Sequence, residues 1–137
     1  MYKNGSHIDI AKGMMLLAGA DNEISEPELY WLKDNLLSRY DDSEESFDEV
    51  KNFDYSKVDT KDYLSSLSLQ IDDSEKKYFL YDAIRMCSAD RLYSDEERAA
   101  SKKAAEIFEV SDEMLKAIEH LIEMERAVEV TKESILG

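Results

Sequence analysis

Apolar residues recur along most of the chain three and four positions apart, which is the spacing of one buried face of an α-helix. This pattern predicts helices over about residues 6–20 and 73–89, and helices that begin after Ser25, after Ser94, and after Ser111 or Asp112. The stripes that should pack inward are Ile10, Met14, Leu17 and Ala18; Leu29, Leu32, Leu36 and Leu37; Leu80, Ile84 and Cys87; Ala100, Ala104, Ile107 and Phe108; and Leu115, Ile118, Leu121 and Ile122. The last helix is expected to run to about Lys132.

The stretch 41–75 is less regular and predicts two short helices, one around Phe47 and Val50 and one around Leu64 and Leu67. The chain has one proline and four glycines, too few turn residues for a β-sandwich or a barrel. It also lacks the glycine cluster of a P-loop or a Rossmann site. We therefore predict an all-α fold of about seven helices in a single domain, residues 1–137.

Two of the predicted helices begin with the same signal. Ser25 is followed three positions later by Glu28, and Ser94 by Glu97, and each pair predicts a capping box. The flanking residues also match, because 69 positions separate Asp21 from Asp90, Ser25 from Ser94 and Glu28 from Glu97. The chain thus predicts an internal repeat of one helix-loop-helix motif, near residues 8–40 and 77–109, related by an approximate twofold axis.

Capping accounts for the serines and glutamates of the repeat, whereas Asp21 and Asp90 lie just before the caps. In register with an EF-hand loop, the first copy would have Leu17 and Gly19 where calcium requires oxygen ligands, so neither loop holds calcium alone. If the two corners face each other, their carboxylates could share calcium or magnesium. The candidate ligands are Asp21, Glu28, Asp90 and Glu97, with Glu23 and Asp95 beside them. The alternative is a solvated acidic rim in which each aspartate stabilises a turn.

Net charge and composition indicate which classes of partner and which compartment to expect. The formal net charge of −15 repels nucleic acids and anionic lipid surfaces and favours cations and basic protein surfaces. Cys87 is the only cysteine, which suits a reducing compartment, and its place on an apolar stripe predicts a small buried side chain. No apolar run is long enough to span a bilayer. We therefore expect a cytoplasmic protein with no direct membrane insertion and no nucleic-acid partner.

The segment from Met14 to Glu28, MMLLAGADNEISEPE, resembles the TerB-like family, which is named for tellurite resistance and is related to the N-terminal region of a DnaJ-like membrane co-chaperone. The second copy, from Cys87 to Glu97, resembles the repeated motif of that family, and the likeness extends over about residues 8–130. It implies a stress-response module that is not an enzyme, with acidic residues that bind a metal or a protein partner such as a membrane-associated stress complex. Asn22 and Arg91 depart from the family pattern, which has glycine at both positions.

Three functions remain open from the sequence. The first is the TerB-like acidic interaction module, which binds a divalent cation and a protein partner. The second is a purely structural scaffold whose acidity maintains solubility. The third is a small metal-dependent hydrolase that uses the clustered carboxylates, and it requires a concave pocket around them.

Overall fold

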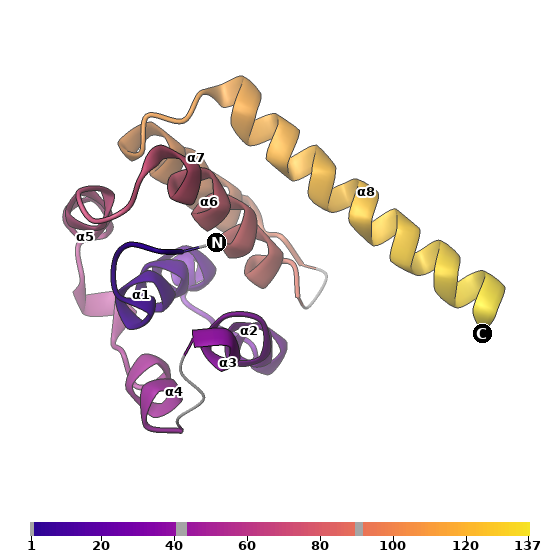
Figure 1. Cartoon of the computed structure of the whole chain (residues 1–137), viewed down its shortest axis with the longest axis horizontal. Coiled ribbons are helices and arrows are strands. Elements are labelled where there is room, and N and C mark those ends of the chain that lie inside the picture. The colour runs from indigo at the N-terminus through magenta and orange to yellow at the C-terminus, as the bar shows by residue number, and fades with distance from the viewer. Residues whose placement is uncertain (1, 41–43, 90–91) are drawn as a thin grey trace.

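Helices account for nearly all of the regular structure in the computed structural model, which describes residues 2–40, 44–89 and 92–137 (Figure 1). The α-helices are α1 (His7–Ala18), α2 (Glu26–Leu32), α3 (Ser38–Tyr40), α4 (Glu44–Lys51), α5 (Thr60–Ser68), α6 (Asp73–Cys87), α7 (Asp95–Ile107) and α8 (Asp112–Leu136). Short 3-10 turns cover Gly19–Asp21 and Tyr55–Lys57, and a π turn covers Lys33–Leu37. These ranges contain no strand, so the all-α prediction is confirmed. The approximate twofold axis and the domain assignment remain predictions.

Helix α1 forms the centre of the core. It packs against α4, α5, α6 and α7, and its apolar stripe is fully buried. Gly13 permits the close approach of its neighbours, because a Cβ there would lie 3.1 Å from both the Phe79 ring and a Leu67 methyl group. The apolar stripe predicted for the first helix is therefore the buried face of the helix that the others pack around.

Helix α2 begins as predicted, with Ser25 at its N-cap and Pro27 in its first turn. Its backbone then passes through the π turn into α3 without leaving the helical path. A π turn holds more residues than an α turn and shifts the positions that face inward. The predicted stripe follows this shift, since Leu32, Leu36 and Leu37 are buried and Leu29 is partly buried.

Helix α8 differs from the prediction in length and in packing. It ends at Leu136, and only its first part, through Leu115, Ile118 and Ile122, packs on the core. Leu121 is 44% exposed, so its predicted burial is wrong: it lies about 100° around the helix from Ile122, off the face that packs inward. From residue 123 onward every residue is exposed, although Glu125 and Arg126 still form hydrogen bonds with Tyr81 and Ser88, and Figure 1 shows the end of α8 projecting beyond the other helices.

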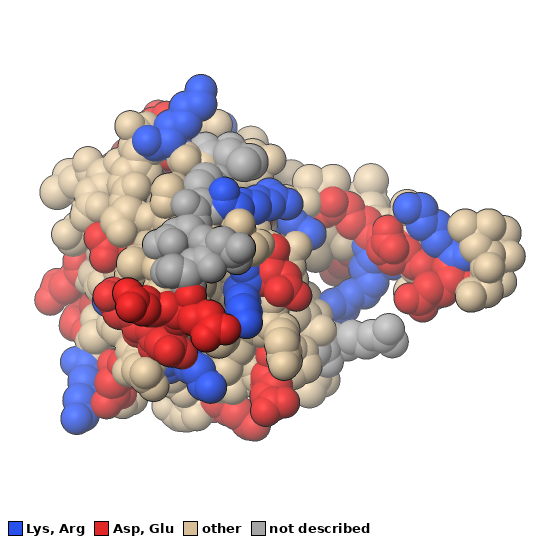
Figure 2. All heavy atoms as spheres, turned by 60° about the horizontal axis from the view of Figure 1, so that its bottom comes forward, with Lys and Arg blue, Asp and Glu red and all other residues tan. Residues whose placement is uncertain are grey.

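The surface in Figure 2 carries acidic side chains in several groups, with Lys and Arg side chains dispersed among them and along α8. It shows no continuous basic patch of the kind that follows a nucleic-acid backbone. Within the described ranges, no helix is both long enough and apolar enough to cross a membrane.

The two parts of α8 should differ in their contribution to stability. Ile118 is 8% exposed, and Ile118→Ala is expected to lower the free energy of unfolding by about 2 kcal/mol or more. Ile135 is 74% exposed, and the same change there is expected to stay within about 0.5 kcal/mol of the wild type. Urea unfolding of both variants measures the difference. Equal losses would show that the end of α8 packs against other protein atoms in solution.

Candidate cation site

The two predicted capping boxes both form. In the first, the Ser25 N–H donates to Glu28 Oε1 at 2.8 Å, and the Glu28 N–H donates to Ser25 Oγ at 3.3 Å. In the second, the Ser94 N–H donates to Glu97 Oε1 at 2.9 Å, and the Glu97 N–H donates to Ser94 Oγ at 3.1 Å. Each glutamate therefore turns back toward the start of its own helix and commits one carboxyl oxygen to the cap.

The two capping glutamates also meet each other. α2 and α7 both pack on α6, and Glu28 and Glu97 are only 2% and 1% exposed. One ligand atom each from Glu28, Glu97 and Cys87, the last residue of α6, lie within 4.8 Å of one another. The alternative of a solvated acidic rim is therefore wrong for these two glutamates, although it describes other carboxylates of the two corners.

The electrostatics of this pair are unfavourable without a proton or a cation. Burial, with the neighbouring Glu97 carboxyl adding to it, raises the pKa of Glu28 from 4.5 to about 8. Burial also raises the pKa of Glu97. Glu28 Oε2 is buried and accepts no N–H or hydroxyl group of the described residues, and the carboxyl group with which Glu28 can share a proton is that of Glu97. Two carboxylates facing each other away from water repel, so the corner requires a positive charge or a shared proton between them.

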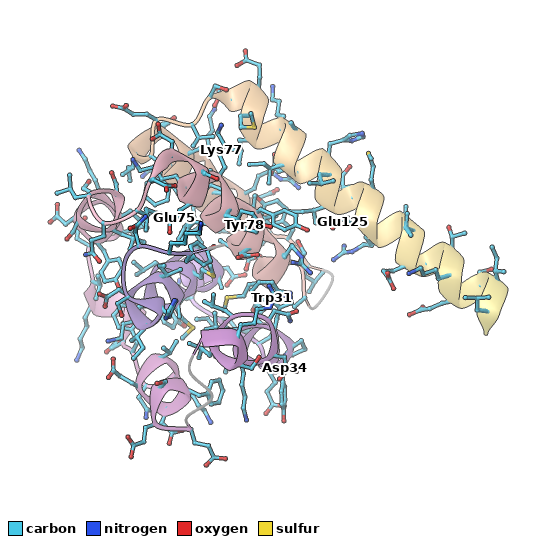
Figure 3. The ribbon with its side chains drawn as sticks, viewed as in Figure 1. Trp31, Asp34, Glu75, Lys77, Tyr78 and Glu125 are labelled. Atoms are coloured by element: carbon cyan, nitrogen blue, oxygen red, sulfur yellow. The ribbon has the colours of Figure 1, made fainter. Side chains whose placement is uncertain are left out.

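A third capping box shows how a purely structural glutamate is treated in this fold. Glu75 lies at the start of α6 (Figure 3), and it is 3% exposed. Its Oε2 accepts the N–H groups of Lys3 and Asn4 at 2.7 and 2.9 Å, and its Oε1 accepts Asn4 Nδ2 at 2.7 Å. Although burial raises the pKa of Glu75, these bonds and the bond from the Asp72 N–H lower it to about 2. Glu75 is thus a satisfied carboxylate, whereas Glu28 is not.

The aspartates of the candidate set are placed differently. Asp21 is exposed and accepts the Glu23 N–H at 3.2 Å, which is the turn-stabilising contact considered from the sequence. It lies outside the three-residue cluster, but its charge is close enough to raise the pKa of Glu97 and Cys87. Asn22 has a positive φ of 65°, which explains why glycine suits this position and why asparagine is tolerated. Asp90 and Arg91 lie outside the described residues.

Cys87 is the member of the cluster that the sequence did not suggest as a ligand. Its predicted burial is confirmed, since it is fully buried. Burial, together with the negative charges of Glu97, Glu28 and Asp21, raises the pKa of its thiol. The repeat offers no signal for this role, because the equivalent position in the first copy is Ala18.

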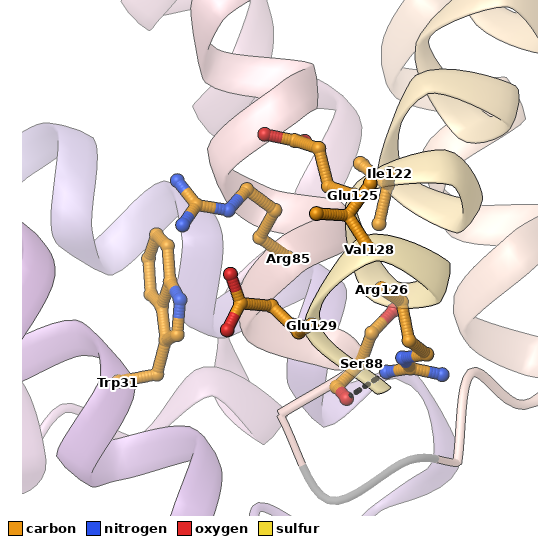
Figure 4. Close-up of a pocket in the computed structure, with 8 residues that line it drawn as sticks. All are labelled: Trp31, Arg85, Ser88, Ile122, Glu125, Arg126, Val128 and Glu129. Carbon is orange, nitrogen blue, oxygen red and sulfur yellow. Dashed lines mark hydrogen bonds between the residues drawn. The ribbon is translucent and has the colours of Figure 1, made fainter. Parts of the chain in front are cut away.

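Cavities lie elsewhere on the described surface. One of about 440 Å³ opens between α2, α6 and the projecting part of α8 (Figure 4). Arg85 stacks over the Trp31 ring there, 5.4 Å from its centroid, and Arg126 Nη2 donates to the Ser88 carbonyl oxygen at 2.6 Å. Neither Glu28 nor Glu97 lines this cavity, and neither lines any of four smaller cavities on the described surface. These five cavities therefore do not supply the concave carboxylate pocket that a hydrolase requires.

Comparison with known proteins places the fold. No protein-family model matches the chain, and no curated protein matches its sequence. The structure is similar to the crystal structure of a tellurite resistance protein from Nostoc punctiforme, with a TM-score of 0.73 and 20% sequence identity. The match covers 95% of this chain and 79% of that protein. The resemblance to the TerB-like family is thus confirmed for the fold, a helical arrangement shared over nearly the whole chain.

The unmet charge at this corner should appear as a pH dependence of stability. The pKa of Glu28 rises on folding, so the stability linked to its proton is full below pH 4.5 and is lost as the pH rises through about 8. Gln at position 28 keeps the cap, remains neutral and can donate to Glu97. With a chelator present, the free energy of unfolding of Glu28→Gln is expected to be higher than that of the wild type above pH 8, by on the order of 1–2 kcal/mol.

Glu75→Gln is the matched control. Its folded pKa is lowered to about 2, so its contribution is present above pH 4.5 and is lost only as the pH falls toward 2. That variant should lose about 1–3 kcal/mol at neutral pH. Urea unfolding from pH 4 to 9 compares the three proteins, and a destabilised Glu28→Gln at pH 9 would contradict the account of the buried pair.

Proposed function

We propose that this chain is a TerB-like acidic interaction module that binds a divalent cation between Glu28 and Glu97 and a protein partner elsewhere. In this proposal the protein is not an enzyme, and Asp21, whose charge raises the pKa of Glu97, adds negative charge near the bound ion. The single observation that supports it most strongly is the burial of two capping carboxylates that face each other, one with an oxygen that accepts no N–H or hydroxyl group of the described residues.

The comparison of the three capping boxes favours the cation over the scaffold alternative. A scaffold needs from a capping glutamate only what Glu75 provides, a buried carboxylate whose oxygens all accept hydrogen bonds. Glu28 and Glu97 contribute the same caps but keep a second function available, since their remaining oxygens lie beside another carboxyl group. A divalent cation would take the place of the proton that the two carboxyl groups otherwise need between them.

A role in tellurite or stress response is the biological setting of the proposal. Its support is the fold shared with the Nostoc punctiforme tellurite resistance protein, together with the repeated acidic motif. In such a response the module would act by binding its cation and its protein partner, and not by catalysis.

The projecting part of α8 supports the partner-binding half of the proposal. Leu121, near the end of the packed part of α8, and Met124, Val128 and Ile135 beyond it are all exposed and are spaced by three, four and seven positions. That spacing places them on one face of the helix, in the register by which helices pair side by side. The partner should therefore offer an apolar helix face, and basic residues beside it would suit the net charge of −15.

Isothermal titration calorimetry of the chelator-treated protein with calcium, magnesium, manganese and zinc tests the cation proposal. The wild type is expected to show saturable binding of at least one of these ions. The double variant Glu28→Gln with Glu97→Gln should lose it, because both caps remain but the two anionic ligands are gone.

The control is Asp95→Asn with Glu96→Gln, which removes the same charge from exposed positions in the first turn of α7. It should bind as the wild type does. Absence of saturable binding by the wild type would favour the scaffold, and equal weakening in both double variants would reduce the effect to the general negative field. Hydrolysis of a test ester or phosphoester that is lost in the glutamate double variant would instead favour the hydrolase.

A further inference from the structure

The sulfur of Cys87 shares the buried space of the two glutamates. Its side chain is fully buried at the C-terminal end of α6, and its ligand atom lies within 4.8 Å of those of Glu28 and Glu97. It is the only cysteine of the chain, so a disulfide within one molecule is excluded. Cys87 belongs to the apolar core, yet its sulfur also lies beside two carboxyl groups, which a small apolar filler does not require.

We infer that the site takes a thiophilic divalent cation of the zinc and cadmium class, with the Cys87 sulfur as its third protein ligand. The inference rests on the proposed cation site and specifies the ion. Calcium and magnesium are bound by oxygen ligands, so the Cys87 sulfur would not serve as a ligand for either ion. Zinc binds both thiolate and carboxylate groups, at roughly 2.3 Å and 2.0–2.2 Å.

The spacing of the three groups suits such an ion. Ligands in a tetrahedral zinc site lie roughly 3.5 Å from one another, as follows from those bond lengths. The three ligand atoms here are already within 4.8 Å without an ion, so small side-chain rotations close the site. The three ligands come from α2, α6 and α7, and the fourth position is left to water.

The caps orient the carboxylate ligands. Glu28 Oε1 accepts the Ser25 N–H and hydroxyl at 2.8 and 3.0 Å, which leaves Oε2 as the oxygen for the ion. Glu97 Oε1 is held in the same way by the Ser94 N–H at 2.9 Å. Hydrogen bonds of this kind fix the direction of metal ligands in protein sites, so the capping serines form the support of the site.

Binding balances in charge and protons. The ion displaces the protons of the Cys87 thiol and of whichever glutamate is protonated, and these pass to the buffer. One thiolate and two carboxylates then face a charge of +2, which stabilises the three anionic groups in place of the protons they release. No redox change accompanies this exchange.

Cobalt(II), cadmium and zinc titrations of the reduced, chelator-treated chain test the assignment. A sulfur-to-metal charge-transfer band is expected with cobalt and cadmium, and since the chain has one cysteine, the band belongs to Cys87. Cys87→Ser should remove the band and weaken zinc binding at least about tenfold, measured by competition with a chelator. Cys87→Ala, which keeps the apolar character, serves as a second variant if the serine change unfolds the protein.

The outcomes separate this inference from the proposed function. Saturable calcium or magnesium binding that depends on Glu28 and Glu97, with no charge-transfer band and no preference for zinc, keeps the proposed function and overturns the role of Cys87. Absence of binding by every ion overturns both. A band that persists in Glu28→Gln with Glu97→Gln would place the sulfur on an ion outside this site and would likewise overturn the inference.

Discussion

The structure depends on one electrostatic constraint, which is that two carboxyl groups required to start helices are buried against each other. Glu28 and Glu97 each use one oxygen to satisfy the N-cap of α2 or α7, and both are almost fully removed from water. A helix start at either corner without its glutamate would leave a backbone N–H unsatisfied in a buried place. The same side chains therefore stabilise the fold locally and oppose it where they meet.

This conflict is resolved differently at the two kinds of corner. At the start of α6, the N-terminal segment lies across the cap, and its backbone and Asn4 side chain supply donors to both oxygens of Glu75. Between α2 and α7 there is no such segment among the described residues, and the corner is closed by Cys87 of α6. The shared corner therefore needs either a proton held between Glu28 and Glu97 or the cation of the proposed function, whereas Glu75 needs neither.

The sequence predicts the elements well and the site only in part. Helix starts follow from local chemistry, and Ser25, Ser94 and Ser111 cap the helices that the pattern assigned to them. The repeat allows Glu28 and Glu97 to meet as one of two alternatives, but it does not predict their burial, because a capping glutamate is normally solvated. The role of Cys87 and the exposure of Leu121 depend on how helices are rotated against one another, which periodicity along a single helix does not determine.

The net charge and the ligand set would act differently on the proposed ion: the first attracts all cations, and the second distinguishes between them. A field from a net charge of −15 draws every cation toward the surface and does not distinguish magnesium from zinc. Discrimination has to come from the ligand set, and here the set includes a sulfur atom held in place by the packing of α6. Because the shared fold with a 20% identical protein carries no information on position 87, the choice of ion belongs to this chain's own residues. In the proposed site, the acidity of the chain would set how readily cations arrive, and the ligands of the buried corner would decide which of them is retained.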